Sequence, residues 1–477
     1  MKKSTANKAI ISCLLFSVVI SNTACKKTLS GSSLINRAQS ENYEQLSTDQ
    51  QEVVDTLPLD QLIVWRKPTS TPAQVQAWIQ GIKATFGPVD TLRLCESCDN
   101  SLMLLTGKGI KNYIQGGTAS GGKKSQTVPS SGDPGPAYIS FNFPINGKPI
   151  KLLTGSATAI PAVTNLNQSV KIAVPDTGID TFELKNYPFK PDTASCIPGA
   201  AWGWNFIAHN KNFRDDDPTK HGSTVTRFIT NEVDKIQKNP IEILPAKTHT
   251  KKGISDLETL LCAFAYAQKQ EAKIINASCG FYEAPDLKHP VDPDVVLLKE
   301  YVRYYLTNNK ILLVAAAGNE DDINEHAAFK LHNLPYPKND RSLDEVNFFP
   351  ASLAGDPTFP NVIAVTTVDT SSGTVSPTQN YSPNVVDIGV NADAVSPLHY
   401  VFNNPRLKGN QTVEGSSFAT PIVTGKLCAN YDEISQVLDN ATYTKDQIWN
   451  ALGTSTVVSK TNLKSFVKNG RMMKRSK

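Results

Sequence analysis

Residues 170–178 read VKIAVPDTG, a short apolar run that ends in an aspartate and a turn. Similar apolar runs occupy residues 274–277, 311–316 and 362–368. Continuous runs of this length are typical of strands that are buried on both faces of a sheet. Segments with helical spacing lie between them. The chain therefore predicts an α/β fold, in which helices flank a parallel sheet and right-handed crossovers join its strands.

Polar motifs follow three of these runs. Asp176 ends the first run, residues 278–280 follow the second and Asn319 follows the third. Because chemistry in parallel α/β sheets collects at the carboxyl ends of the strands, we expect these residues to lie near one another. Two more motifs, HGSTV at 221–225 and GSSFATP at 415–421, lie where helices are expected to begin.

These motifs combine the groups that acyl transfer needs. A serine hydroxyl becomes a nucleophile when a neutral imidazole takes its proton, and a carboxylate orients and stabilises the imidazolium that results. Ser417, His221 and Asp176 supply these groups. The tetrahedral oxyanion needs fixed donors, for which the Asn319 amide and the Ser417 backbone N–H at a helix start are suitable. Each residue alone could be a turn or a helix cap, but together they predict one catalytic site.

The four blocks, in this order, resemble the signature blocks of the subtilisin family of serine peptidases. They are DTGID at 176–180, HGSTV at 221–225, AAAGN at 315–319 and GSSFATP at 415–421. The resemblance covers the chain from about residue 160 to 475. It implies a subtilisin-like fold and a serine endopeptidase that hydrolyses peptide bonds through an acyl-enzyme.

The resemblance also implies a role for each candidate residue. Asp176, His221 and Ser417 form the catalytic triad, and Asn319 lies in the oxyanion hole. Two other classes of protein compete with this interpretation. The first is a catalytically idle subtilisin fold that serves as a surface binding module, against which the complete set of triad residues argues. The second is a lipase or esterase, which is disfavoured because the G-x-S-x-G elbow is absent around Ser417.

By the same resemblance, Ser278, Cys279 and Gly280 pair with the extended backbone of the substrate as an added strand. Such pairing uses main-chain hydrogen bonds and accepts many side chains, so we expect broad specificity. The three residues are equally the end of an ordinary strand. Thr224 stands where many relatives have a second histidine, and Cys279 stands where an apolar residue is usual. The specificity of relatives therefore cannot be transferred to this chain.

The N-terminus has the features of an export signal. Basic residues precede the apolar run 9–20, and small and polar residues follow it up to Ala24, which predicts a signal peptide over residues 1–24. Cys25 resembles the lipid-modified cysteine of bacterial lipoproteins, which tethers a protein to a membrane. Cleavage after Ser21 is the alternative. We therefore expect an exported protein that is periplasmic, anchored in the cell envelope or extracellular.

The remaining chain divides into a polar linker or tether and two ordered parts. Residues 25–58 are polar, and residues 59–115 predict a small α+β domain with the order β-α-β-β. This domain resembles the propeptide of many subtilisins, and a permanent accessory domain is the alternative. Residues 116–150 are expected to be a flexible linker in which the chain could be cleaved, and residues 151–477 form the peptidase domain.

Cysteine spacing predicts a local disulfide. Cys95 and Cys98 form a lone C-x-x-C, and no second pair or histidine cluster supports zinc, so a Cys95–Cys98 disulfide is favoured over half a zinc site or a redox motif. Disulfides are permitted in the oxidising compartment that the export signal indicates. The pairing of Cys196, Cys262 and the later cysteines cannot be read from the sequence.

Charge and composition limit the partners. The net charge of +4 in 477 residues is mild and spread along the chain, so nucleic acid is not expected as a partner. We expect a monomer that acts on protein or peptide substrates and whose chemistry requires no cofactor. Calcium is common in the family as a structural ion, and Asp215, Asp216 and Asp217 offer oxygens, although acidic loops are usually only solvated.

Overall fold

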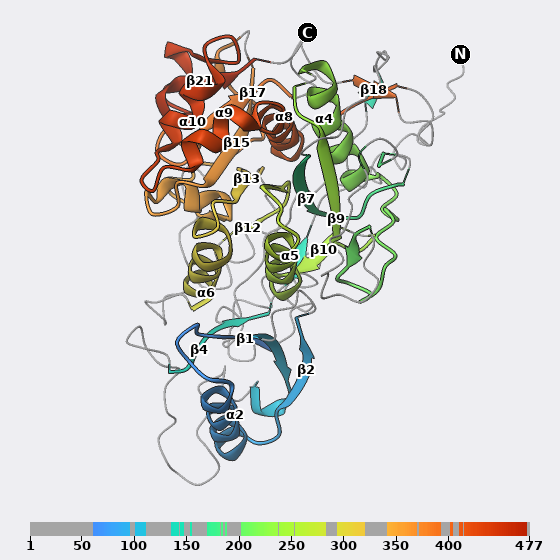
Figure 1. The fold of residues 1–477 in the computed structure, drawn as a ribbon, viewed down its shortest axis with the longest axis vertical. Helices are drawn as coiled ribbons and strands as arrows, with labels where there is room; N and C mark the ends of the chain where they lie inside the picture. Colours follow the sequence, from blue (N-terminus) through green and yellow to red (C-terminus); the bar gives the residue numbers. More distant parts are fainter. Residues whose placement is uncertain are drawn as a thin grey trace, which may run out of the picture.

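The architecture is given by a computed structural model of the chain (Figure 1). It describes residues 61–95, 101–110, 135–142, 144–146, 153–154, 169–181, 183–184, 187, 202–236, 238–251, 253–282, 293–319, 341–369, 372–392, 401–403, 410–413 and 415–474. The predicted export signal, Cys25 and the polar linker lie outside the described residues. No helix within the described ranges is both long and apolar enough to cross a membrane.

A large sheet forms the centre of the molecule, as the apolar runs predict. In the described chain its strand order is β20-β21-β17-β15-β13-β11-β7-β9-β8, and β16 pairs with β15. Neighbours from β8 to β21 run parallel, whereas β20 and β16 are antiparallel to their neighbours. Its strands are β7 (Val170–Asp176), β8 (Trp204–Asn205), β9 (Ile241–Lys247), β11 (Ile274–Ala277), β13 (Leu312–Ala316), β15 (Val362–Asp369), β16 (Thr374–Val375), β17 (Ile388–Val390), β20 (Val457–Ser459) and β21 (Arg471–Met473).

Helices cover both faces of this sheet. Helices α4 and α8 lie side by side on one face, and α5, α6 and the π-helical turn η4 cover the other (Figure 1). The bounds are α4 (His221–Ile236), α5 (Leu257–Lys269), α6 (Pro293–Val302), η4 (Arg303–Thr307), α8 (Ser416–Ala429), α9 (Tyr431–Leu438) and α10 (Lys445–Leu452). Short 3-10 turns lie at η5 (Ala351–Gly355), η6 (Thr461–Leu463) and η7 (Lys468–Gly470). The α/β fold with a parallel sheet flanked by helices is confirmed.

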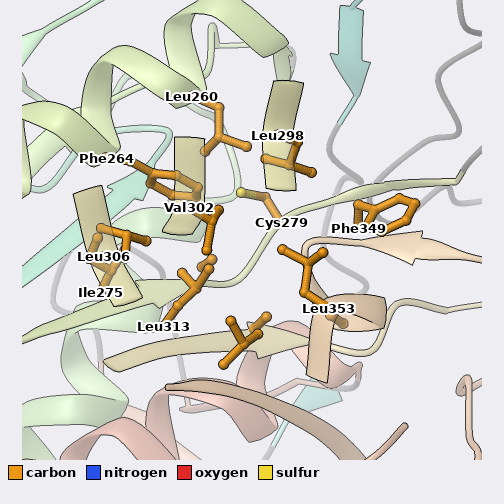
Figure 2. Packing of buried hydrophobic residues seen from close by; sticks show 14 of the residues in the cluster. Leu260, Phe264, Ile275, Cys279, Leu298, Val302, Leu306, Leu313, Phe349 and Leu353 are labelled. Atoms are coloured by element: carbon orange, nitrogen blue, oxygen red, sulfur yellow. The ribbon is translucent and has the colours of Figure 1, made fainter. Parts of the chain in front are cut away.

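Alternation along the strands explains why both faces are covered. Successive side chains of a strand point to opposite faces. Ile274 accordingly packs in the cluster under α4 and α8, whereas Ile275 packs in the cluster under α5 and α6. Figure 2 shows the second cluster, where Leu260 and Phe264 of α5 meet Ile275 and Leu313 of the sheet. A strand that is buried on both sides has no polar alternation, which is why the runs are mainly apolar.

The small domain has its own antiparallel sheet. Its strands β1 (Gln61–Arg66), β2 (Asp90–Leu94), β3 (Leu102–Thr106) and β4 (Ala137–Phe141) have the order β2-β3-β1-β4. Helix α2 (Pro72–Phe86) packs on one face, and Thr71 and Gln74 form a capping box at its start. The small domain was expected to end at residue 115, but strand β4 follows that residue and pairs with β1. Part of the segment that was expected to be a linker therefore belongs to the small sheet.

Short strands join distant segments of the chain. Strand β5 (Pro144–Asn146) is antiparallel to β10 (Ile254–Asp256), so the chain that leaves the small domain adds a strand to the peptidase domain. Strands β12 (Phe281–Tyr282) and β14 (Phe348–Phe349) form a second pair. A third short sheet contains β6 (Leu153–Thr154), β18 (Val401–Asn403) and β19 (Asn410–Thr412).

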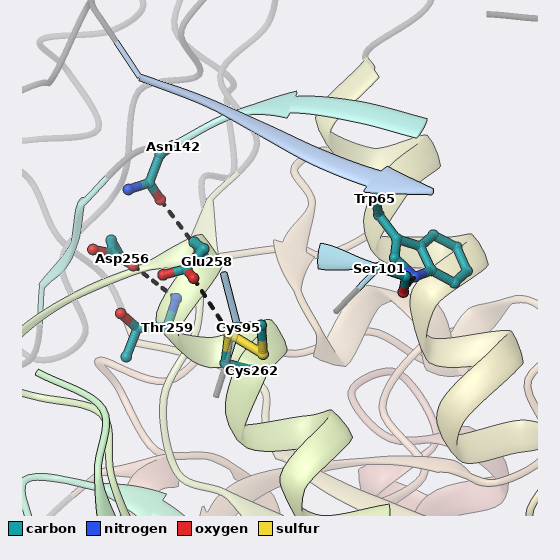
Figure 3. The surroundings of a disulfide bond; sticks show 8 residues. All are labelled: Trp65, Cys95, Ser101, Asn142, Asp256, Glu258, Thr259 and Cys262. Carbon is teal, nitrogen blue, oxygen red and sulfur yellow. Dashed lines mark hydrogen bonds between the residues drawn. A yellow bond between two sulfur atoms is a disulfide. The ribbon is translucent and has the colours of Figure 1, made fainter. Parts of the chain in front are cut away.

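The predicted Cys95–Cys98 disulfide is wrong. Cys95 is bonded instead to Cys262 of α5, which is 167 residues away in the sequence (Figure 3). The reason is geometric: Cys95 is buried where β2 ends, and its Cα lies 5.6 Å from the Cα of Cys262, within the usual disulfide range. Such a contact depends on how two domains pack, and local spacing does not reveal it. Cys98 lies outside the described residues.

Candidate active site

Asp176 is the last residue of β7 and is almost completely buried. Its backbone carbonyl accepts hydrogen bonds from the N–H groups of Thr248 (2.8 Å) and His249 (3.1 Å), which follow the neighbouring strand β9. Its carboxylate oxygen Oδ1 accepts from the Thr177 N–H at 2.7 Å and contacts His221 Nδ1 at 2.7 Å. Both the backbone and the side chain of Asp176 are therefore fixed.

His221 is the first residue of α4, and its backbone N–H donates to Asp217 Oδ2 at 3.2 Å. The next residue has to be small. A Cβ on Gly222 would lie 2.1 Å from the Gly178 carbonyl oxygen and 3.1 Å from the Asp176 Cβ. The absence of a side chain therefore lets the start of α4 approach the loop after β7 closely, which brings His221 into contact with Asp176.

The pair differs in charge preference from isolated side chains. Burial alone raises the pKa of Asp176, but His221, His249 and the Thr177 N–H together hold that pKa below its ordinary value. Burial alone lowers the pKa of His221, but the carboxylates of Asp176, Asp217 and Asp215 together raise that pKa above its ordinary value. Each partner therefore favours the charged form of the other. This is the relation that a base needs when it has to hold a proton during a reaction.

Ser417 lies in the first turn of α8. Gly415 precedes the helix with a φ of 118°, a conformation that glycine adopts without strain. The Ser417 hydroxyl donates to the Ser278 carbonyl at 2.9 Å, and the Ser278 hydroxyl donates back to the Ser417 carbonyl at 2.8 Å. Among the described residues there is no hydrogen bond between Ser417 Oγ and His221. The His221 ring lies 5.3 Å from the ring of Phe418, the residue that follows Ser417.

Asn319 follows β13 and faces the start of α8. Its oxygen Oδ1 accepts from the Ser416 backbone N–H at 3.0 Å and from the Ser416 hydroxyl at 3.2 Å. The Asn319 backbone carbonyl accepts from the Tyr282 hydroxyl at 2.7 Å. Because Oδ1 is held by Ser416, the orientation of the amide is set and Nδ2 is the end left for another acceptor. No acceptor for Nδ2 is present within the described part of the chain.

The predicted substrate-binding residues have different surroundings. The side chain of Cys279 packs in the hydrophobic cluster beside Leu298 (Figure 2), so it replaces an apolar residue as a core side chain. Gly280 is tightly packed, since a Cβ there would lie 2.4 Å from the Phe349 carbonyl oxygen. Ser278 is fixed by its exchange of hydrogen bonds with Ser417. The structure thus brings Ser278 to Ser417, and it turns the Cys279 side chain into the core.

A second polar layer supports the site, and sequence reasoning missed its role. Asp215 is buried and accepts from the Ser223 N–H (2.9 Å), the Ser223 hydroxyl (2.8 Å) and the Thr177 hydroxyl (3.1 Å). It therefore links the loop after β7 to the first turn of α4. Asp217 accepts from the N–H of His221. A cap for the His221 helix could have been suspected from the position of Asp217 four residues earlier, but the Asp215 contacts could not.

The three neighbouring aspartates do not converge on one point. Asp215 and Asp217 contact the groups given above, whereas Asp216 Oδ1 accepts from Lys247 Nζ at 2.7 Å. In the described ranges, no group of three or more histidine, cysteine or acidic side chains has an arrangement that could hold a metal ion. The carboxylates considered for calcium therefore do not fit a calcium site in their present arrangement.

His249 is a second buried histidine near Asp176. Burial lowers its pKa to about 4, so it is neutral at ordinary working pH. Its Nδ1 contacts the Thr248 hydroxyl at 2.9 Å, and within the described residues its Nε2 has no hydrogen-bond partner. His249 is therefore a buried neighbour of Asp176, and its backbone N–H donates to the Asp176 carbonyl.

Comparison with known proteins was made for the sequence and for the fold. Residues 167–470 match the family model described as the subtilase family. A search of curated proteins finds no match. Among solved structures, the fold is similar to that of the epidermin leader peptide processing serine protease from Staphylococcus aureus, with a TM-score of 0.53 and 18% identity over 87% of this chain and 96% of that chain.

Two further structures give comparable values. A mutant of the same staphylococcal protease has a TM-score of 0.52 and 15% identity, with coverage of 87% of this chain and 97% of that chain. A structure described as a lanthipeptide protease has a TM-score of 0.45 and 20% identity, with coverage of 64% and 85%. At such identities, the first two similarities concern the fold alone.

Proposed function

The chain belongs to the subtilase family and is a serine-type peptidase, and on that basis we propose that it is an exported endopeptidase with Asp176, His221 and Ser417 as its triad. The observation that carries the triad is the 2.7 Å contact between Asp176 Oδ1 and His221 Nδ1. This contact fixes the imidazole tautomer with the proton on Nδ1 and so makes Nε2 the basic atom. The proximity of the His221 and Phe418 rings supports Ser417 as the nucleophile.

The proposed reaction has two halves. Ser417 Oγ attacks the carbonyl carbon of the substrate, and its proton passes to His221 Nε2. The C–N bond then breaks, His221 gives the proton to the leaving amine, and the acyl group stays on Ser417. A water molecule next loses a proton to His221 and attacks the ester, which releases the acid and restores the hydroxyl. Asp176 stays ionised throughout and stabilises the imidazolium.

The oxyanion of each tetrahedral intermediate is assigned to Asn319 Nδ2 and the Ser417 backbone N–H. The hydrogen bonds from Ser416 to Asn319 Oδ1 support this assignment, because they orient the amide before substrate arrives. Preorganised donors act mainly on the transition state, where the negative charge develops. The position of Ser417 in the first turn of α8 supports its N–H as the second donor, since helix N-termini carry unsatisfied N–H groups.

Substrate is proposed to bind as an extended strand along the main chain of residues 278–280. The burial of the Cys279 side chain favours a main-chain mode, since that side chain is in the core and is not available for selection. Main-chain recognition accepts many sequences, so we propose broad specificity for proteins and peptides.

Export is proposed from residues 1–24, with lipid attachment at Cys25. The basic start, the apolar run and the small residues before Cys25 support export. The mass of the mature N-terminus tests both points: a diacylglycerol or acyl mass on Cys25 supports the tether. A mature chain that begins at Asn22 without lipid would replace the tether with free secretion.

The triad is tested with Ser417→Ala. We expect this change to lower turnover of a casein substrate by about 10⁶-fold, because the triad acts as a unit. The measurement also includes the intact mass after treatment with a fluorophosphonate, which we expect to label the wild type once and Ser417→Ala not at all. Ser372→Ala, which removes an exposed hydroxyl, is the matched control and should match the wild type. Wild-type turnover by Ser417→Ala would contradict the assignment.

An idle subtilisin fold that serves as a binding module is the second candidate. One observation favours it: the Ser417 hydroxyl donates to the Ser278 carbonyl and not to His221. Catalytic hydrogen bonds are often made only in the substrate complex, so this geometry does not decide the matter. A folded wild-type protein that neither hydrolyses casein nor takes the fluorophosphonate label would establish the idle module.

A further inference from the structure

The two domains are joined by a covalent bond at their contact. Cys95, at the end of β2, is linked to Cys262 in α5, and Figure 3 shows the bond against the body of the helix. The chain between these cysteines contains both β4 and β5. A single cut in this intervening chain, on either side of β4, leaves the two products joined through the disulfide.

The disulfide lies in a contact that is already extensive. The ring of Trp65 in β1 lies 5.0 Å from the ring of Tyr301 in α6 and 5.6 Å from that of Tyr304 in η4. On its other side Trp65 stacks on Tyr138 of β4 at 5.3 Å. Its Nε1 donates to the Ser101 hydroxyl at 3.0 Å, which satisfies its one polar atom within the contact.

The small sheet has a second apolar face, and among the described residues it packs against the peptidase domain. Leu62 and Val64 of β1 pack with α2, whereas Ile63 and Trp65, which point the other way, belong to the same cluster as residues of α5 and α6. Without the peptidase domain, this second face would be exposed to water. Exposing such a face is costly, so the small domain is built to stay on its partner.

The chain that leaves β4 strengthens the same contact. Asn142 Nδ2 donates to Gln61 Oε1 at 2.8 Å, and Asn142 Oδ1 accepts from the Glu258 N–H at 3.2 Å. One side chain therefore bridges the small sheet and the first turn of α5. The next strand, β5, pairs with β10 of the peptidase domain. Strand β4 thus belongs to the small sheet while the chain after it belongs to the peptidase domain.

We propose that the small domain is a permanently retained part of the mature protein, cross-linked to α5 by Cys95–Cys262, and that a cut between β3 and β4 does not release it. Such a cut would leave β4 with the peptidase part and still paired with β1, so the two products would share one sheet. The bond forms when the two thiols lose two electrons and two protons to a disulfide exchange partner, which is reduced to two thiols. This inference concerns no active-site residue and is independent of the proposed peptidase activity.

The test uses the full mature chain carrying Ser417→Ala, which prevents self-cleavage, with a recognition sequence for tobacco etch virus protease inserted after Gly121. After cleavage we expect one species on native size-exclusion chromatography and one band on a non-reducing denaturing gel. Dithiothreitol, which takes up the disulfide as its own cyclic disulfide, should convert that band into two. Added Cys262→Ala should give two bands without reductant, whereas Cys428→Ala, which removes another buried cysteine of the peptidase domain, should behave as the parent.

Peptide mapping without reduction supplies a second readout that does not depend on the folding of a variant. We expect a cross-linked peptide pair that contains Cys95 and Cys262. Cys95 joined to Cys98, or alkylation of Cys95 and Cys262 by iodoacetamide in the unreduced denatured parent, would overturn the proposal. Elution of the small domain as a separate fragment from the cut parent would also overturn it.

Discussion

The polar wall of the candidate site consists of Asp176, His221, Asn319 and the buried polar groups that contact them. This wall and the contact between the two domains are held together in opposite ways. At the wall, buried polar groups fix one another through short hydrogen bonds, and Asp176 Oδ2 is buried without a partner among the described residues. At the domain contact, aromatic and aliphatic side chains pack around Trp65, and a disulfide joins the two sides. Polar networks set precise geometry at a cost in desolvation, whereas apolar packing contributes stability with less directional precision.

This comparison leads to a division of effects. Changes in the wall should lower the rate far more than the free energy of unfolding, because the lost interactions act on the transition state. Changes at the domain contact should lower stability and leave the turnover of the remaining folded protein almost unchanged.

After Ser417→Ala, the largest effect is expected from Asp176→Asn. An amide cannot stabilise the imidazolium and favours the wrong tautomer of His221, so we expect kcat to fall by about 10⁴-fold. The measurement is steady-state hydrolysis of a chromogenic peptide, with the urea midpoint recorded in parallel. Asp439→Asn, at a highly exposed carboxylate, is the matched control and should leave kcat unchanged. A loss below tenfold would remove Asp176 from the triad.

Trp65→Ala tests the other region. The side chain is almost completely buried, so its removal leaves a large cavity, and we expect a loss of about 3–5 kcal/mol in the free energy of unfolding. Turnover of the folded fraction should stay within about twofold, since Trp65 touches no residue of the wall. Urea unfolding followed by circular dichroism measures the loss. Trp202→Ala is the matched control, because Trp202 is 52% exposed and its loss should cost less than about 0.5 kcal/mol.

Asn319→Leu returns to the wall. Leucine has a similar size but no donor, so we expect kcat to fall by about 10²–10³-fold with little change in KM, the pattern of an interaction made in the transition state. The change also removes one of the two acceptors of the Ser416 N–H, while Gln379 Oε1 still accepts from it at 2.7 Å, and a parallel urea titration separates that structural effect from the kinetic one. Asn440→Leu, on an exposed asparagine, controls for the substitution itself. An increase in KM with unchanged kcat would assign Asn319 to ground-state binding instead.

The same division separates what the sequence could predict from what it could not. The parallel sheet was predictable because a strand that is buried on both faces has to be mainly apolar, as at residues 172–174 and 311–316. The candidate catalytic residues were predictable because Asp176 lies at the carboxyl end of a parallel strand and His221 lies at the start of a helix, where functional side chains of such sheets collect.

The domain contact could not be predicted in the same way. A disulfide between Cys95 and Cys262 depends on packing between segments that are far apart in the sequence, and the local spacing of Cys95 and Cys98 favoured a different pair. The small-sheet position of β4 was missed because it follows a stretch rich in glycine, serine and proline, which carries no strand signal of its own. Neither the Cys95–Cys262 disulfide nor the pairing of β4 with β1 is determined by spacing along the chain. Both depend on which apolar faces of the two domains pack against each other.

The smallest effect, and the finest test of the polar wall, is expected from Asp217→Asn. His221 has to be neutral to accept the proton from Ser417, so activity is lost as pH falls through its pKa. Burial lowers that pKa, but the carboxylates of Asp176, Asp217 and Asp215 together raise it above its ordinary value, so the acid limb of the rate profile should lie above pH 6.5. Removing the charge of Asp217 makes the imidazolium less favourable, and the limb should move to lower pH by a few tenths of a unit.

The measurement for Asp217→Asn is kcat/KM against pH, which reports the groups of the free enzyme. Asp432→Asn, at an exposed carboxylate in α9, should leave the limb in place. A shift to higher pH would mean that the carboxylate of Asp217 disfavours the imidazolium, and the electrostatic account of the wall would then be wrong. A lower rate at every pH with an unmoved limb would show that Asp217 serves only as the backbone acceptor for the His221 N–H, a purely structural role of the kind found at the domain contact.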